Sequence, residues 1–172
     1  MTDASNMTYA RYLGLDRLLS ARDPISDQHD EMLFVIIHQT KELWLKEIIH
    51  EVELAKRLIA AHDVEPAYKA LARVSRIQTV MTLSWDVLAT MTPADYLSFR
   101  GDLGSSSGFQ SHQFRTLEYL LGLKDQSFLK FHEERSSALG QLQAALDAPS
   151  LYDVAIAQLP RHGLAVPDSA LN

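Results

Sequence analysis

The sequence has no cysteine among its 172 residues. Disulfides, Cys-x-x-Cys redox centres and thiolate metal ligands are therefore excluded within this chain. Any metal that these residues bind must be held by histidine, carboxylate, tyrosine or methionine side chains. With no export signal in view, the missing cysteines do not by themselves indicate a cellular compartment.

The chain also lacks an excess of positive charge and long apolar runs. It has 16 Lys and Arg against 22 Asp and Glu, a formal charge of −6, which disfavours a nucleic acid or an anionic membrane as the principal ligand. No run approaches the roughly 18 consecutive apolar residues of a membrane span, and Met1 to Met7 has no signal-peptide pattern. We expect a cytoplasmic protein whose partner is a small molecule or another protein.

Glycine and proline are scarce, with 7 and 6 residues, and long segments contain neither. Apolar residues recur at three- and four-residue steps over residues 26–61, which predicts one long amphipathic helix capped by Ser26 or Asp27. A second helix is predicted from Pro66 to residue 88. Thr92 and Pro93 begin a short helix that ends near Phe99.

Helical spacing resumes after the turn-rich residues 101–107 and runs over residues 108–121 before Gly122. Shorter helices are predicted at residues 126–133, 136–146 and 150–159, with Pro160 and Pro167 breaking the last region. No run alternates with the period of a strand. The sequence thus predicts an all-α helical bundle, one domain over residues 1–172 with an amino-terminal arm (1–25) and core helices (26–172).

Two pairs of residues suit a binding pocket. His38 follows Phe34 by four residues, so both lie on one helix face, either as a satisfied core histidine or as the wall of an aromatic pocket. Arg100 follows Tyr96 by four residues, and it either caps the end of its helix or binds a ligand carboxylate through two parallel hydrogen bonds. Together these parts suit an aromatic amino acid.

Three other patterns are weaker. Gly104-Ser105-Ser106-Ser107-Gly108 fits the G-x-S-x-G pattern, but no strand precedes it, so we favour an ordinary loop or a loop whose amides bind an anion. Glu47-Ile48-Ile49-His50 resembles half of a di-iron site, without the second copy that such a site needs. The histidines form no His-x-x-x-His pair, which argues against a zinc site.

Several ordered segments resemble the tryptophan 2,3-dioxygenase family across nearly the whole chain. They are Thr8-Tyr9, Tyr12-Leu13, His29-Asp30-Glu31-Met32-Leu33-Phe34, His38-Gln39-Thr40, Glu42-Leu43-Trp44, Phe99-Arg100, Ser106-Ser107-Gly108-Phe109-Gln110-Ser111 and Pro149-Ser150-Leu151-Tyr152-Asp153. The resemblance implies an all-α enzyme of that type, with haem b as its iron cofactor. It would use dioxygen to cleave the indole C2–C3 bond of L-tryptophan to N-formylkynurenine, the first step of kynurenine-route tryptophan catabolism.

The resemblance also implies roles for individual residues. His38 would be the catalytic residue, accepting the indole N–H, and Arg100 would bind the substrate carboxylate with Tyr96 beside it. The indole pocket would be lined by Phe34, Val35, Ile36 and Ile37. The residues near the haem would be Trp85, Ser107, Gly108 and Phe114. Tyr9 and Tyr12 would reach into a neighbouring subunit's pocket within a homotetramer that exchanges its amino-terminal arms.

One part of the family pattern has no counterpart here. The family's proximal histidine, which binds the haem iron, and a threonine at the substrate ammonium come from a segment after the position that matches Asn172. None of the seven histidines matches that ligand. We expect either an incomplete chain or a shortened relative. The alternatives are a catalytically inactive, haem-free tryptophan-binding fragment and a related haem oxygenase acting on a modified indole.

Overall fold

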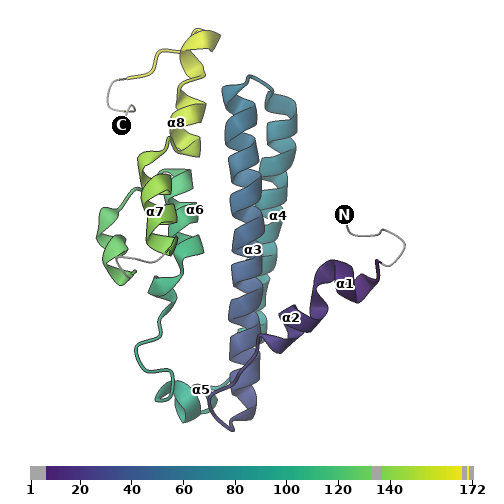
Figure 1. Cartoon of the computed structure of the whole chain (residues 1–172). Coiled ribbons are helices and arrows are strands. Elements are labelled where there is room, and N and C mark those ends of the chain that lie inside the picture. Colours follow the sequence, from purple (N-terminus) through teal and green to yellow (C-terminus); the bar gives the residue numbers. More distant parts are fainter. Residues whose placement is uncertain (1–6, 133–136, 168–169, 171–172) are drawn as a thin grey trace.

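The computed structural model describes residues 7–132, 137–167 and 170, and this part of the chain is helical without a strand. Figure 1 shows a long antiparallel pair, with shorter helices along one side of it and two more extending from its base. No helix in the described residues is long and apolar enough to cross a membrane. The elements are α1 (Tyr9–Leu13), α2 (Leu15–Ser20), α3 (His29–Ala60), α4 (Val64–Leu88), α5 (Pro93–Arg100), η2 (Gly108–Gln110), α6 (His112–Leu121), η3 (Gln126–Phe131), α7 (Ser137–Asp147), α8 (Leu151–Ile156) and η4 (Leu159–His162).

The main core lies where α3, α4 and α6 meet. Side chains at helical spacing interlock there, and each fully buried aliphatic residue contributes about 1.5–3 kcal/mol. A second, smaller cluster joins α6 to α7. The first cluster consists of Leu45, Ile48, Val52, Val74, Ile77, Leu117 and Leu120, and the second of Tyr119, Leu142 and Leu146.

The long helix begins later than the sequence predicts. Its N-cap is Gln28, which makes no side-chain cap, so the prediction of a cap at Ser26 or Asp27 was wrong. The buried carboxylate of Glu31 instead accepts hydrogen bonds from the amides of Ile25 and Ser26, each at 2.8 Å, and from the Ser26 hydroxyl. Because the Ser26 side chain is engaged in this way, it fixes the arm against the first turn of α3.

The predicted helix over residues 108–121 is broken at Ser111. The Ser107 hydroxyl accepts from the amide of Phe109 at 3.3 Å, and the Gln110 side chain accepts from the Ser107 amide at 3.1 Å, which closes one 3₁₀ turn. Ser111 then caps α6 by accepting from the amide of Phe114 at 3.1 Å. Two successive caps therefore compete with one continuous helix. Gly122 ends α6 as predicted, at a φ of 118° that glycine tolerates.

Two of the three carboxyl-terminal helices differ from the prediction, while α7 (Ser137–Asp147) lies close to the predicted residues 136–146. Residues 126–131 form 3₁₀ turns, α8 ends at Ile156, and Pro160 lies inside η4 instead of ending a helix. Proline fits there because the first residues of a helical turn donate no amide to it. Glu133 and Ser136, where two predicted boundaries fell, lie outside the described residues.

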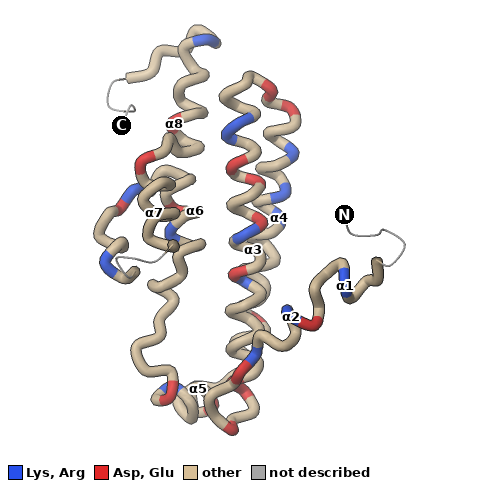
Figure 2. The backbone as a smooth tube through the Cα atoms, viewed as in Figure 1, with Lys and Arg blue, Asp and Glu red and all other residues tan. Residues whose placement is uncertain are grey.

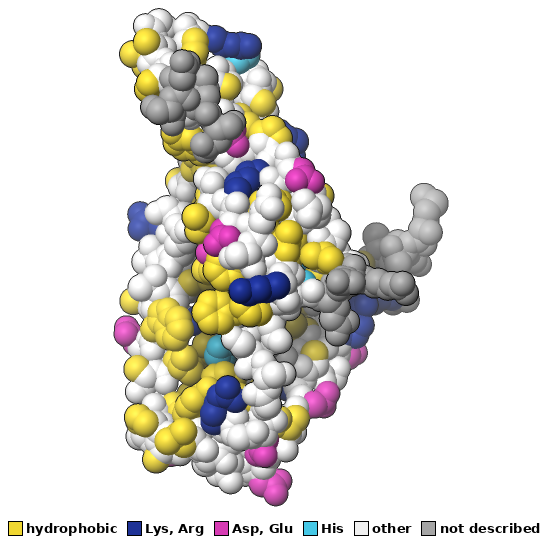
Figure 3. All heavy atoms as spheres, turned by 90° about the vertical axis from the view of Figure 1, so that its left-hand side faces the viewer, with side chains coloured by type: hydrophobic (Ala, Val, Ile, Leu, Met, Phe, Trp, Pro, Cys, Tyr) yellow, Lys and Arg dark blue, Asp and Glu magenta, His cyan; other side chains and the backbone are white. Residues whose placement is uncertain are grey.

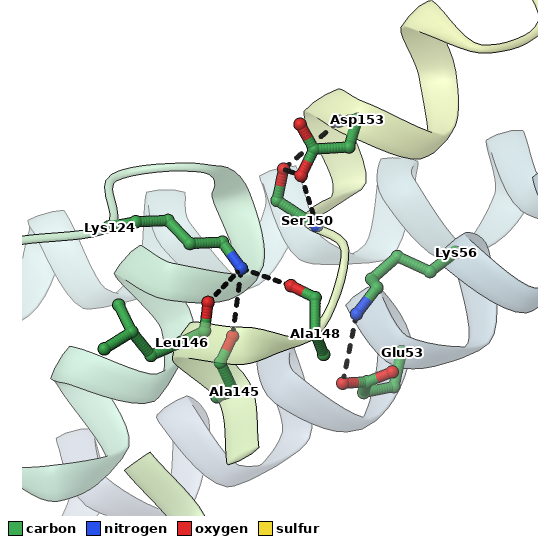
Figure 4. A network of polar contacts seen from close by, with 8 residues as sticks. All are labelled: Glu53, Lys56, Lys124, Ala145, Leu146, Ala148, Ser150 and Asp153. Carbon is green, nitrogen blue, oxygen red and sulfur yellow. Dashed lines mark hydrogen bonds and ion pairs between the residues drawn. The ribbon is translucent and has the colours of Figure 1, made fainter. Parts of the chain in front are cut away.

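A polar network joins the segment after α6 to the end of α7, next to the start of α8 (Figure 4). The Lys124 ammonium donates to the carbonyls of Ala145 at 3.2 Å and Leu146 at 2.7 Å, and also to that of Ala148. These carbonyls lie at the negative end of the α7 dipole, which favours a cation. The adjacent capping box, in which Asp153 accepts from the Ser150 amide at 2.7 Å, starts α8.

Candidate functional site

A cavity of about 660 Å³ opens between α3, α4 and the segment that leads into α6. This volume is typical of small-molecule sites. The lining residues are His38, Lys41, Glu42, Leu45, Ile48, Gln78, Met81, Thr82, Trp85, Ser107, Gly108, Phe109, Ser111, Phe114, Arg115 and Leu117. Of the residues to which the sequence assigns a role at the haem, all four are brought together here.

The cavity wall is largely apolar and aromatic. Trp85 from α4 is 58% exposed and Phe114 from α6 is 41% exposed, so large apolar faces meet solvent. The chain from residue 103 to residue 114 carries no Lys, Arg, Asp or Glu (Figure 2). Figure 3 shows apolar side chains gathered across the side of the molecule that carries α6 and α7, with a histidine among them. Exposed apolar surface bordering a cavity indicates a ligand site.

His38 presents one free acceptor to this cavity. Its Nδ1 lies 2.7 Å from the carbonyl oxygen of Phe34, and because a carbonyl only accepts, Nδ1 carries the hydrogen. In the neutral imidazole the lone pair is then on Nε2. The Phe34 ring lies 4.1 Å from the imidazole, centroid to centroid, and fixes its orientation. A ligand N–H is the natural donor to Nε2.

An aromatic cluster extends from His38 to α5. The Phe34 ring lies 5.8 Å from Tyr96 and 5.7 Å from Phe99, and Tyr96 lies 5.6 Å from Phe99. Phe99 is fully buried and secures α5 against the start of α3. Sequence reasoning gave Phe99 no role, although its position three residues after Tyr96 on a short apolar helix was the available signal.

The other predicted substrate residues lie outside the cavity lining. Arg100 donates from Nη1 to the carbonyl of Gly104 at 3.1 Å, which braces the loop before η2. Ile37 is buried and Ile36 is exposed, while Val35 is half-buried. Tyr9 and Tyr12 are 77% and 74% exposed on α1, which extends away from the α3–α4 pair (Figure 1).

The sequence analysis gave no role to two cations that line the cavity. The Lys41 ammonium lies 3.3 Å from the centroid of the Trp85 ring, and burial lowers the Lys41 pKa. Arg115 is buried, pairs with Glu118 at 2.5 Å and packs over Phe128 at 4.1 Å. Its Nε has no hydrogen-bond partner among the described residues. For Lys41 the available signal was its position three residues after His38, which places both side chains on one face of the helix.

Comparison with known proteins decides the family. The family model described as tryptophan 2,3-dioxygenase matches residues 1–151. The chain belongs to the tryptophan 2,3-dioxygenase family. It is 80% identical over 169 residues to the tryptophan 2,3-dioxygenase of Caulobacter vibrioides, covering 98% of this chain and 64% of that protein.

More distant relatives agree. The enzymes of that name from Bacillus cereus and Bordetella pertussis are 52% and 51% identical, over 97% and 98% of this chain and 60% and 59% of their own lengths. The chain therefore spans about 60% of the length of the curated relatives that it matches. The sequence prediction of this family and of an all-helical fold is confirmed.

Tryptophan 2,3-dioxygenases depend on haem, and the cavity residues fit the macrocycle of such a group. Trp85 and Phe114 supply flat apolar surfaces, and a Cβ built on Gly108 would meet nothing within 4 Å, which leaves space beside the η2 backbone. The cavity lining does not identify the iron ligand. His38 is the one histidine among the lining residues that the structure describes, and the family resemblance assigns it to the indole N–H instead.

Proposed function

We propose that this chain forms the indole- and haem-binding part of a cytoplasmic enzyme that cleaves L-tryptophan with dioxygen to N-formylkynurenine. The observation that carries the proposal is the cavity in which His38 offers a neutral acceptor beside the aromatic faces of Trp85 and Phe114. Haem b, when bound, supplies the iron chemistry that activates dioxygen. The chain's own residues bind and orient the reactants.

His38 orients the indole. Its Nε2 accepts the indole N–H, while the hydrogen bond from Nδ1 to Phe34 holds the tautomer that leaves Nε2 free. Phe34 and Tyr96 form the aromatic wall against which a flat ring packs, with Val35, Ile36 and Ile37 completing the turn of α3 that carries Phe34. This binding fixes the indole ring relative to the cofactor.

Arg100 binds the amino-acid carboxylate. Its guanidinium has five N–H donors, and the hydrogen bond from Nη1 to the Gly104 carbonyl leaves a pair of donors for a carboxylate. The same contact fixes the loop that leads to Ser107 and Gly108, so substrate and cofactor binding share one support. Trp85, Ser107, Gly108 and Phe114 would hold the macrocycle.

The proposed assembly is a homotetramer in which arms are exchanged. Supporting it, Tyr9 and Tyr12 lie exposed on an arm that extends from the body, where a second copy could cover them. Exposed aliphatic side chains along α3 and α4 give a further surface for association: Leu43, Val80, Leu83 and Val87.

An absorption titration with haemin tests this function. We expect the purified chain to convert the broad spectrum of free haemin to a sharp Soret band, and L-tryptophan to shift that band after reduction with dithionite. Product formation would then be followed by the absorption of N-formylkynurenine. A spectrum identical to that of free haemin would refute haem binding by these residues.

A second candidate is a haem-free module that binds tryptophan without turnover. The aromatic cluster of Phe34, His38 and Tyr96 supports it, because a flat ring can pack there without the cofactor. Calorimetry with L-tryptophan in the absence of haemin separates the two. Heat of binding without haemin supports the module, and its absence refutes it.

A further inference from the structure

Lys41 is a cation of the cavity wall that has no ion pair within the described residues. Three charged residues line the wall. Arg115 pairs with Glu118, which lies outside the lining, and the Glu42 carboxylate accepts from the Gln113 side chain at 2.7 Å. Within the described residues, Lys41 has no ion pair or hydrogen bond, and its ammonium lies over the face of Trp85. Lys41 is therefore the cation of this wall that no carboxylate among the described residues pairs with.

An ammonium in this position is under-compensated. Packing against the apolar wall removes part of its water, and the lowered pKa of Lys41 has this burial as its cause. The negative face of the Trp85 ring offsets part of that loss but supplies no acceptor for the ammonium hydrogens. A carboxylate within the cavity would supply both the charge and the acceptor.

We propose that Lys41 is a carboxylate-binding residue of this cavity, and that it pairs with a propionate of the tetrapyrrole. The inference rests on the proposed function and adds a residue to it. Phe34, His38 and Lys41 follow one another along α3, so the indole-binding cluster lies on one side of His38 and Trp85 on the other. Arg100 would bind a carboxylate on the side of the indole-binding cluster. Lys41 lies on the Trp85 side and is therefore available to a propionate of the cofactor.

The probe is metal-free protoporphyrin IX, because it has both propionates and needs no iron ligand. Its dimethyl ester has the same macrocycle without the charges. We expect the chain to bind the diacid more tightly than the ester, and Lys41→Met to weaken diacid binding by about tenfold while leaving ester binding unchanged. Lys41→Arg should restore most of the affinity. Fluorescence titration gives each dissociation constant.

Lys46→Met is the matched control. Lys46 is an exposed lysine on the same helix that does not line the cavity, so its removal changes net charge equally and should leave both affinities as in the unaltered chain. Thermal unfolding of each variant checks that the fold is intact, and Lys41→Gln repeats the test with a polar replacement.

The outcomes separate the inference from the function on which it rests. Equal diacid affinity in Lys41→Met and the unaltered chain overturns the pairing and leaves the proposed function standing. A loss confined to L-tryptophan, absent for tryptamine and for the porphyrin, also overturns it and assigns Lys41 to the amino-acid carboxylate. Failure of the unaltered chain to bind either porphyrin overturns both.

Discussion

Substitution of Gly108 by valine tests whether the open space beside η2 is occupied by a ligand in the working protein. Nothing lies within 4 Å of a Cβ built at this position, and the residue's φ is outside the left-handed region, so the fold does not require glycine here. We expect the free energy of unfolding, measured in urea, to change by no more than about 0.5 kcal/mol.

Ligand binding should respond much more strongly. If the macrocycle packs against the η2 backbone, the added methyl groups overpack the complex by about 1–3 kcal/mol, a loss of roughly 5- to 150-fold in affinity for protoporphyrin IX. Gly101→Val is the matched control, because its Cβ also meets nothing within 4 Å and Gly101 does not line the cavity. Unchanged affinity in Gly108→Val would refute this placement, and a large loss of stability would refute the reasoning about the loop.

Three further predictions concern the substrate, the core and pH. Arg100→Ala should raise the dissociation constant for L-tryptophan by at least tenfold, since a charged pair is lost, and an unchanged constant by calorimetry would rule out the carboxylate role. Leu142→Ala should cost about 2–5 kcal/mol in urea unfolding because the residue is fully buried, and a cost below 1 kcal/mol would contradict the α6–α7 packing. Burial lowers the pKa of His132 below 6.5, so its stabilising contribution is full above about pH 6.5 and is lost as the pH falls through the folded pKa. His132→Gln should flatten that decline, and parallel pH profiles would refute it.

The helices could be read from the sequence because apolar residues recur along α3 and α4 without glycine or proline. Their precise ends could not, since local side-chain bonds decide them. Ser26 binds Glu31 instead of capping α3, and Ser111 starts a new helix within a stretch whose apolar spacing is continuous. Hydrophobic periodicity shows which face of a helix is apolar. It does not show where a side-chain hydroxyl accepts from a backbone amide and so sets the end of a helix.

The candidate site was likewise only partly predictable from the sequence. His38 and Phe34 are four residues apart on one helix, so their shared face follows from spacing alone. The contact of Lys41 with Trp85 joins two helices, and the burial of Arg115 depends on Phe128 beyond the end of α6. Such contacts depend on the crossing of helices, which one sequence does not specify.

The loop beside the cavity is held in place before any ligand arrives. Arg100 braces Gly104, the Ser107 and Gln110 side chains close η2, and Gln113 ties the start of α6 to α3 through the Glu42 carbonyl at 2.9 Å. A ligand that enters this cavity therefore does not have to order the loop, and that entropic cost is removed from binding. That entropy is lost during folding instead, and the folded chain exposes the Trp85 and Phe114 side chains to water in a cavity whose shape is already set.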